Sequence, residues 1–280
     1  MSSDTLFTLP VAPAGAVTKS GSITCTRPFA QQQNIYLLTF TYAPDNRLTP
    51  PFCAALLLAL DIIQYRYPPG VVITTSGIPK FYSNGLDYEN ASGDKAFWAG
   101  SLWPLYRRFL TYPMPTIALM NGHAFAGGLM LAMHHDYRLF NPSRGFLCLN
   151  ELEFGASLHP PMATIFRIKL PSPATYRSLV LESKRFKAQE ALAEGLVDAL
   201  AEKVEEVLKF VDERGLTKKG EKGSYGLLKA EIWREGIQDL EGHAEAESKR
   251  SKDLSGDEVR RKESVQRVEA WEKGRDKAKI

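Results

Sequence analysis

The 280-residue sequence has few cysteines and no long apolar run. Its three cysteines, Cys25, Cys53 and Cys148, lie far apart and form no Cys-x-x-Cys pair, which argues against a disulfide framework and a structural zinc site. The longest apolar stretch, residues 54–63, is interrupted by Asp61 and is shorter than the roughly 18 residues of a membrane span. We therefore expect a protein of a reducing compartment, with no membrane span and no metal.

A strong charge imbalance is also lacking. The formal net charge is +3, and no basic stripe is interleaved with aromatic residues, so nucleic-acid binding is not expected. The N-terminus lacks the charged-then-apolar order of a secretory signal. His134 and His135 are adjacent, and because neighbours on a helix point in different directions, the pair is not expected to share a metal ion.

Apolar strand-like segments alternate with helical ones along the first two thirds of the chain. Strands rich in β-branched and aromatic residues are predicted at 22–28, 34–42, 70–77, 115–125, 136–141 and 145–151. Helices are predicted at 49–67, 97–112 and 127–135, and mainly helical structure from Ser172 onward. Strands that alternate with helices across short loops predict a wound α/β fold with largely parallel strands.

The last part of the chain differs in composition. We expect a catalytic core in residues 1–200 and a charged helical region in residues 201–280, which would serve oligomerisation or cover the active site. The stretch 215–224 is predicted to be an exposed turn or linker. Apolar residues at near-helical spacing predict amphipathic helices near the end, namely Val259, Val265, Val268 and Trp271.

Two glycines stand at an unexpected place. Gly127 and Gly128 lie at the start of an apolar helical run, although glycine costs about 1 kcal/mol against alanine inside a helix. Either a ligand approaches the backbone closely there, or the helix packs tightly against a strand. Both explanations remain open from these residues alone.

The same glycines belong to a set of three segments. The others are "FYSNGLD", from Phe81 to Asp87, and "CLNELEFG", from Cys148 to Gly155. A turn at Asn84-Gly85 would present the N–H of Leu86, and a helix start at Gly127 has unpaired N–H groups. If both N–H groups pointed to one position, they would form an oxyanion hole.

Taken in order, these segments resemble the crotonase superfamily, the enoyl-CoA hydratases and isomerases. The resemblance runs from about Ile23 through Leu200 and fades in the charged C-terminal part. It implies the crotonase-like spiral of ββα units, with a helical C-terminal region. It also places the oxyanion-hole donors at Leu86 and Gly127, and it suggests Asn84, Gly85, Gly128, Met130 and His159 as further residues of the substrate pocket.

Within that family, hydratases carry two glutamates. The first position is Met130 here, and a thioether cannot deprotonate water as a carboxylate does. The second is Glu151, in a segment that resembles the mitochondrial-type and plant peroxisomal Δ3,Δ2-enoyl-CoA isomerases. The resemblance therefore implies an isomerase with Glu151 as its single base. Apolar neighbours at Leu149, Leu152 and Phe154 are expected to raise the pKa of Glu151 by desolvation.

Two other residues compete with Glu151. Alternation along a strand would place Glu153 on the same face as Glu151. His159 stands where another branch of these isomerases carries its glutamate, so it would line the acyl pocket, assist catalysis or be an ordinary loop histidine.

Other activities remain as alternatives. They are a hydratase or another acyl-CoA-transforming enzyme, and a non-catalytic acyl-CoA-binding relative. A serine protease is disfavoured, because the turn "GHAFAGG" has no serine.

The resemblance also implies the molecules that the protein meets. An acyl-CoA would be the substrate, with no separate cofactor, and subunits would form a homotrimer or a dimer of trimers. The last residues, Ala278, Lys279 and Ile280, follow the small–basic–aliphatic order of a peroxisomal import signal. We expect a peroxisomal enzyme of fatty-acid β-oxidation recognised by the import receptor, with mitochondrial and cytosolic locations as alternatives.

Overall fold

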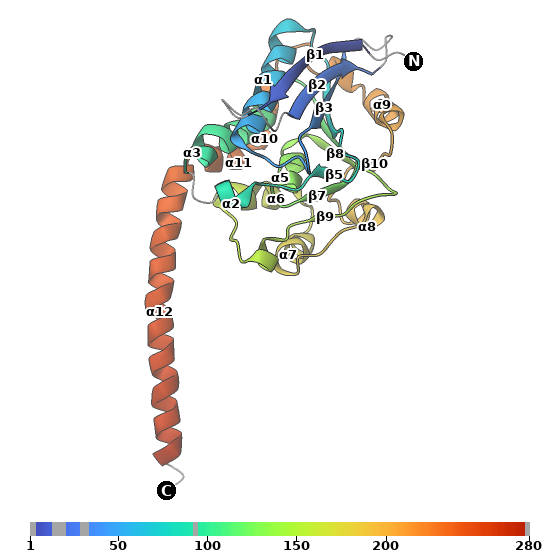
Figure 1. Cartoon of the computed structure of the whole chain (residues 1–280). Helices are drawn as coiled ribbons and strands as arrows, with labels where there is room; N and C mark the ends of the chain where they lie inside the picture. Colours follow the sequence, from blue (N-terminus) through green and yellow to red (C-terminus); the bar gives the residue numbers. More distant parts are fainter. Residues whose placement is uncertain (1–3, 13–20, 29–33, 92–94, 278–280) are drawn as a thin grey trace. The chain divides into compact units, whose positions relative to one another are not determined.

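A seven-stranded sheet forms the centre of the computed structural model, which describes residues 4–12, 21–28, 34–91 and 95–277 (Figure 1). Its strand order is β1-β2-β3-β4-β6-β8-β10, antiparallel from β1 to β3 and parallel from β3 onward. This confirms the largely parallel α/β arrangement. The strands are β1 (Asp4–Val11), β2 (Gly21–Arg27), β3 (Ile35–Thr41), β4 (Val71–Ser76), β6 (Thr116–Met120), β8 (Tyr137–Phe140) and β10 (Ala199–Leu200).

A second, three-stranded parallel sheet has the order β5-β7-β9. Its strands are β5 (Phe81–Ser83), β7 (His123–Phe125) and β9 (Leu147–Cys148). The segment predicted as one strand at 115–125 is therefore two strands in two sheets. They are separated at Gly122, where an added Cβ would lie 2.4 Å from the carbonyl oxygen of Lys80. This close approach of two backbones turns the chain from the large sheet into the small one.

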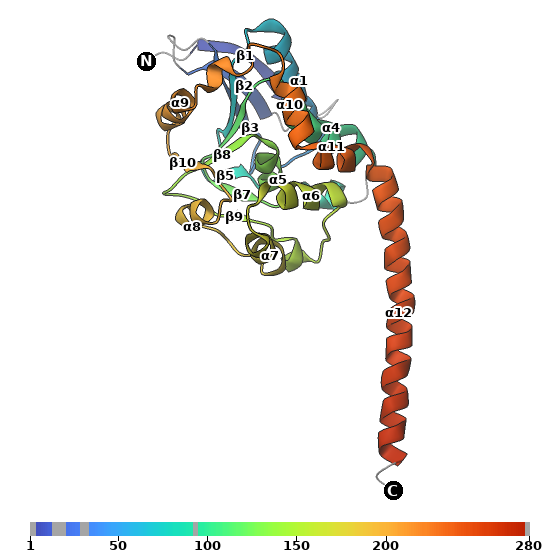
Figure 2. The ribbon, with the colours of Figure 1, turned by 180° about the vertical axis from the view of Figure 1, so that it is seen from behind.

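Helices cover both faces of the large sheet. Helix α1 (Pro50–Arg66) begins as predicted, with Thr49 as its N-cap and two prolines in its first turn. On its side of the sheet, buried residues of α1 and α4 (Trp103–Thr111) share a core with Leu38 and Phe40. On the other side, α9 (Val204–Glu213) packs Val207 and Phe210 against Ile73 and Ile117. Figure 2 shows strands of the sheet between α1 and α9.

The remaining helices are mostly short. They are α2 (Tyr88–Ala91), α3 (Lys95–Phe97), the π-helix η1 (Trp98–Leu102), α5 (Gly127–His134), the 3-10 helix η2 (Glu151–Phe154), α6 (Pro160–Lys169), α7 (Pro173–Leu181), α8 (Ala188–Ala193), the 3-10 helix η3 (Leu216–Lys218), α10 (Tyr225–Ile232), α11 (Arg234–Glu241) and α12 (His243–Lys277). None of them, within the described ranges, combines the length and apolar composition that a membrane crossing requires.

The chain divides into two compact units, residues 1–240 and 241–280. Residues 201–240 thus belong with the sheet, because α9 supplies core side chains and the ammonium of Lys229 pairs with Asp136 at 2.8 Å. In the second unit, α12 carries the apolar residues expected to form an amphipathic stripe, and these residues are exposed. The predicted import signal, Ala278 to Ile280, lies outside the described residues.

Candidate active site

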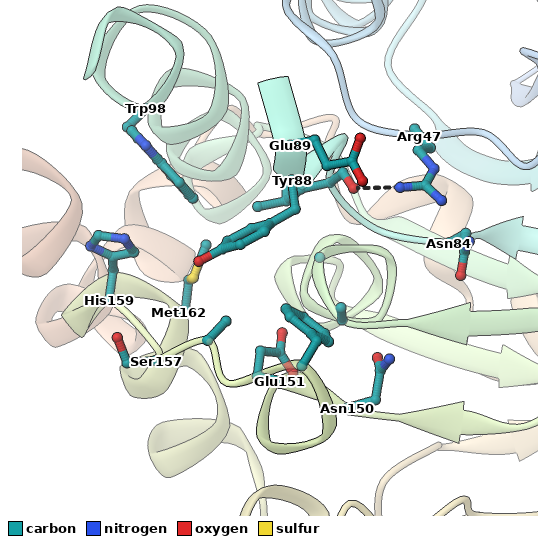
Figure 3. Close-up of a pocket in the computed structure, with 15 residues that line it drawn as sticks. Arg47, Asn84, Tyr88, Glu89, Trp98, Asn150, Glu151, Ser157, His159 and Met162 are labelled. Atoms are coloured by element: carbon teal, nitrogen blue, oxygen red, sulfur yellow. Dashed lines mark hydrogen bonds between the residues drawn. The ribbon is translucent and has the colours of Figure 1, made fainter. Parts of the chain in front are cut away.

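The three segments singled out in the sequence meet at one edge of the small sheet. Each follows one strand: Asn84 follows β5, Ala126 follows β7, and Leu149 follows β9. Because these strands are parallel, their carboxyl ends lie at the same edge. All three segments line a cavity of about 310 Å³, shown in Figure 3.

In the first segment, the position of the Leu86 N–H is set by hydrogen bonds to the carbonyl oxygens of Gly85 and Leu86. Leu48 N–H donates to Gly85 O at 2.8 Å, and the Arg47 guanidinium donates to Leu86 O at 3.3 Å. Gly85 O and Leu86 N–H belong to one planar peptide, so the Leu48 bond directs the Leu86 N–H to the opposite side. Gly85 has a φ of 87°, a conformation that glycine adopts without strain.

The second segment brings another amide to the same place. Ala126 has the unusual φ of 47°, is held by its N–H bond to Cys148 O at 2.9 Å, and is followed by the helix start at Gly127. A Cβ added at Gly85 would lie 3.0 Å from Gly127 N, and one at Gly127 would lie 3.3 Å from Leu86 N. The two amides therefore adjoin one small space. The structure gives neither of them an acceptor among the described residues.

Glycine is required at positions 127 and 128 for different structural reasons. At Gly127, a Cβ would crowd the Leu86 amide and side chain beside the cavity. At Gly128, which does not line the cavity, a Cβ would lie 2.3 Å from Ser83 O in β5. The need to keep the backbone accessible at the cavity therefore explains Gly127. The tight packing of α5 against β5 explains Gly128.

The third segment contributes a buried carboxyl. Glu151 begins η2 and lines the cavity, and its Oε2 atom is buried with no hydrogen-bond partner among the described residues. Burial raises the pKa of this carboxyl from its ordinary value of 4.5 to about 7. The raised pKa confirms the predicted direction and leaves a substantial fraction of Glu151 ionised at neutral pH.

Its immediate neighbours differ from the prediction. Residues 145–151 were expected as one strand, but β9 ends at Cys148 and Glu151 starts a 3-10 helix. Leu149 is buried, whereas Leu152 and Phe154 are 58% and 47% exposed. The helical turn rotates successive side chains away from one another. Leu152 was predicted to shield the Glu151 carboxyl from solvent, and it does not.

The same turn separates the two glutamates. The prediction that Glu153 shares a face with Glu151 is wrong, because it assumed strand alternation. Glu153 is exposed and forms an ion pair with Arg185 at 3.1 Å. It is absent from the cavity lining.

The other predicted pocket residues divide into two groups. Asn84 and His159 line the cavity. Gly85, Gly128 and Met130 do not line it. Met130 is 1% exposed and faces the hydrophobic core from the first turn of α5, where its carbonyl oxygen accepts from His134 at 2.7 Å.

Several important residues were not found from the sequence. The segment Asp45–Arg47 supports the first segment of the site: Asp45 accepts hydrogen bonds from the backbone and side chain of Asn84 at 2.9 and 2.7 Å, and the Asn46 carbonyl accepts from Ser83 at 2.7 Å. Their adjacent Asp and Asn are typical of an ordinary turn, so no signal distinguished them. Other lining residues that were not predicted as part of the pocket are Tyr88, Glu89, Trp98, Ala126, Asn150, Phe154, Ala156, Ser157 and Met162.

The paired histidines are part of the core. His134 and His135 are both buried, and burial lowers the pKa of His134 to about 3. His135 Nε2 lies 2.8 Å from the Thr74 hydroxyl. Over the described ranges, His, Cys, Asp and Glu side chains form no group of three that would hold a metal ion.

Known proteins resemble this chain in sequence and in fold. The family model described as enoyl-CoA hydratase/isomerase matches residues 30–272. "Enoyl-CoA delta isomerase 2, peroxisomal" of Arabidopsis thaliana is 34% identical over 62% of this chain and 76% of its own length. "Enoyl-CoA delta isomerase 1, peroxisomal" of the same plant is 32% identical over 73% and 88%. The crystal structure of a probable enoyl-CoA hydratase of Mycobacterium tuberculosis has a TM-score of 0.68 at 22% identity, covering 83% of this chain and 98% of that one.

Proposed function

Because the chain belongs to the enoyl-CoA hydratase/isomerase family, we propose that it is a Δ3,Δ2-enoyl-CoA isomerase of fatty-acid β-oxidation. The observation that carries this proposal is the buried carboxyl of Glu151 in a cavity that also adjoins two backbone amides, neither of which has an acceptor in the part of the chain that the structure describes. The similarity to the two plant delta isomerases supports the same choice. A coenzyme A thioester is then the substrate and not a resident cofactor.

The proposed reaction uses one base twice. Ionised Glu151 removes a proton from C2 of the 3-enoyl thioester, and the C2–H electron pair spreads over a dienolate that ends on the thioester oxygen. The Leu86 and Gly127 N–H groups donate to this oxygen as negative charge collects on it. Protonated Glu151 then returns the proton to C4, which leaves the double bond between C2 and C3. Protons and electrons balance, so the reaction requires no oxidant or reductant.

The environment of Glu151 suits both steps. A pKa of about 7 lets the carboxyl accept and return a proton near neutral pH. The N–H of Gly127 also lies at the start of α5, where the helix dipole favours negative charge.

The proposal is tested by converting trans-3-hexenoyl-CoA to its 2-enoyl isomer. Glu151→Gln preserves the size of the side chain but removes the base, so we expect kcat to fall by about a thousandfold. Glu153→Gln is the matched control, because Glu153 lies outside the cavity lining and pairs with Arg185. Full activity of the Glu151 variant would refute the assigned base.

A hydratase is the second candidate, and a specific observation favours it. Glu89 of α2 is exposed and lines the same cavity as Glu151, so it offers a second carboxylate that sequence comparison at Met130 does not reveal. Hydration of crotonyl-CoA by the wild type that collapses in Glu89→Gln would establish this alternative. We expect little hydration by either protein.

We propose the peroxisome as its compartment, since both plant relatives carry that word in their names. A fluorescent protein fused to the N-terminus should colocalise with a peroxisomal marker, and deletion of Ala278 to Ile280 should disperse it. An unchanged distribution after deletion would contradict the predicted signal.

The trimer or dimer of trimers that the family resemblance implies stays a prediction. Size-exclusion chromatography with light scattering measures the assembly directly, and a monomer would contradict it.

A further inference from the structure

The cavity is chemically different at its two ends. Figure 3 shows Arg47 and Asn84 on one side, Trp98 and His159 on the other, and Glu151 between them. One end therefore offers a guanidinium and an amide to a polar group. The other offers the rings of Trp98 and His159 and the thioether of Met162, with the hydroxyls of Tyr88 and Ser157 nearby.

The aromatic end is a supported wall. Trp98 opens the π-helix η1, and its ring centroid lies 4.7 Å from that of His159 and 5.3 Å from that of Trp103. Trp103 is only 4% exposed, as is Met162, so the wall rests on core residues. A π-turn inserts an extra residue into a helix and is frequently found at functional sites. Here it places the indole of Trp98 in the cavity lining.

We propose that this wall receives the acyl chain and that Trp98 limits its length, so the preferred ligands are thioesters of short acyl groups. The acyl identity rests on the proposed function. Three observations support the proposal. The aromatic end lies across Glu151 from Arg47 and Asn84, the indole of Trp98 is backed by buried residues, and the cavity of about 310 Å³ is near the lower limit for ligand pockets.

The consequence is a defined break in chain-length preference. Each methylene taken from water into an apolar pocket improves binding by about fourfold. Methylenes that extend beyond Trp98 gain nothing in the wild type. Leucine at this position keeps the wall apolar but frees space, and room for two more methylenes corresponds to about a fifteenfold gain.

The test measures dissociation constants of hexanoyl-CoA and decanoyl-CoA by isothermal titration calorimetry. These saturated thioesters cannot isomerise, so the measurement reports on the pocket alone. For Trp98→Leu we expect the ratio of the two constants to shift about fifteenfold in favour of decanoyl-CoA. Trp271→Leu is the matched control, since Trp271 is 61% exposed on α12 and is absent from the lining; its ratio should equal that of the wild type.

A shift below threefold in Trp98→Leu, or failure of the wild type to bind either thioester, would overturn the inference. If the leucine variant does not fold, Trp98→Phe, which removes less volume, replaces it. The expected shift in the ratio is then about fourfold. An unchanged ratio in Trp98→Phe would also overturn the inference. Wild-type turnover of trans-3-hexenoyl-CoA is measured in parallel. No turnover with the chain-length shift present would refute only the proposed function, whereas turnover with an unchanged ratio would refute only the role of Trp98.

Discussion

The two sides of the cavity are built in different ways. On the donor side, the N–H groups of Leu86 and Gly127 belong to the backbone and are positioned by hydrogen bonds and by the absence of side chains at glycine. On the base side, the proposed base is the side chain of Glu151. Burial raises the pKa of its carboxyl, and its Oε2 atom has no hydrogen-bond partner among the described residues. The donor side should therefore be sensitive to added atoms, and the base side to chemical identity and to pH.

The largest effect on stability should come from Gly128, the glycine that packs against a strand. In Gly128→Ala, the new Cβ would lie 2.3 Å from Ser83 O, so backbone must move and we expect a loss of about 3 kcal/mol in unfolding free energy. Urea denaturation measures it. Gly274→Ala is the control, because a Cβ there meets nothing within 4 Å. Equal stability of both variants would contradict the packing role.

Substitution of the neighbouring Gly127 should reduce activity more than stability. In Gly127→Ala, the Cβ would lie 3.3 Å from Leu86 N and would occupy the space beside both donors. We expect kcat/KM for trans-3-hexenoyl-CoA to fall about a hundredfold, as for the loss of one oxyanion donor, with less loss of stability than in Gly128→Ala. If the two variants lost activity and stability in the same proportion, the separation of the two glycines would be wrong.

The base side should reveal itself through pH. Because the folded-state pKa of Glu151, about 7, exceeds its ordinary value of 4.5, the carboxyl contributes most to stability below pH 4.5 and that contribution is lost as pH rises through 7. Glutamine does not ionise. After allowance for partial exposure, Glu151→Gln should gain about 2 kcal/mol relative to the wild type between pH 4 and pH 8. Urea denaturation at both pH values tests this gain, and a pH-independent difference would contradict the desolvated base.

The smallest effect should come from the support of the donor loop. Arg47→Met removes the hydrogen bond to Leu86 O, and a bond of this kind contributes about 1 kcal/mol, which corresponds to about fivefold in kcat. Arg66→Met, at an exposed position of α1, is the control and should leave kcat unchanged. A higher KM with unchanged kcat in Arg47→Met would show that Arg47 contacts the ligand and does not position the loop.

Predictions from the sequence succeeded where the determinant is local. Helix α1 carries its start signal within its own sequence, at Thr49 and the two prolines, and it begins where predicted. The predictions failed at Glu151 to Phe154, where a 3-10 helix replaces a strand and exposes Leu152. They also missed the segment Asp45–Arg47, whose role depends on contacts with residues more than 35 positions away.

The sequence by itself determined the alternation of strands and helices and the three segments that carry the candidate chemistry, because periodicity, caps and turn residues act over a few neighbouring positions. It also indicated Glu151 and the donors at Leu86 and Gly127 through the family resemblance. Only the tertiary structure decided that Gly127 and Gly128 serve different purposes, that Glu153 leaves the site, and that Trp98 and Glu89 enter it. Those outcomes depend on which distant backbones and side chains come within a few ångströms of one another, and local patterns do not specify such distances.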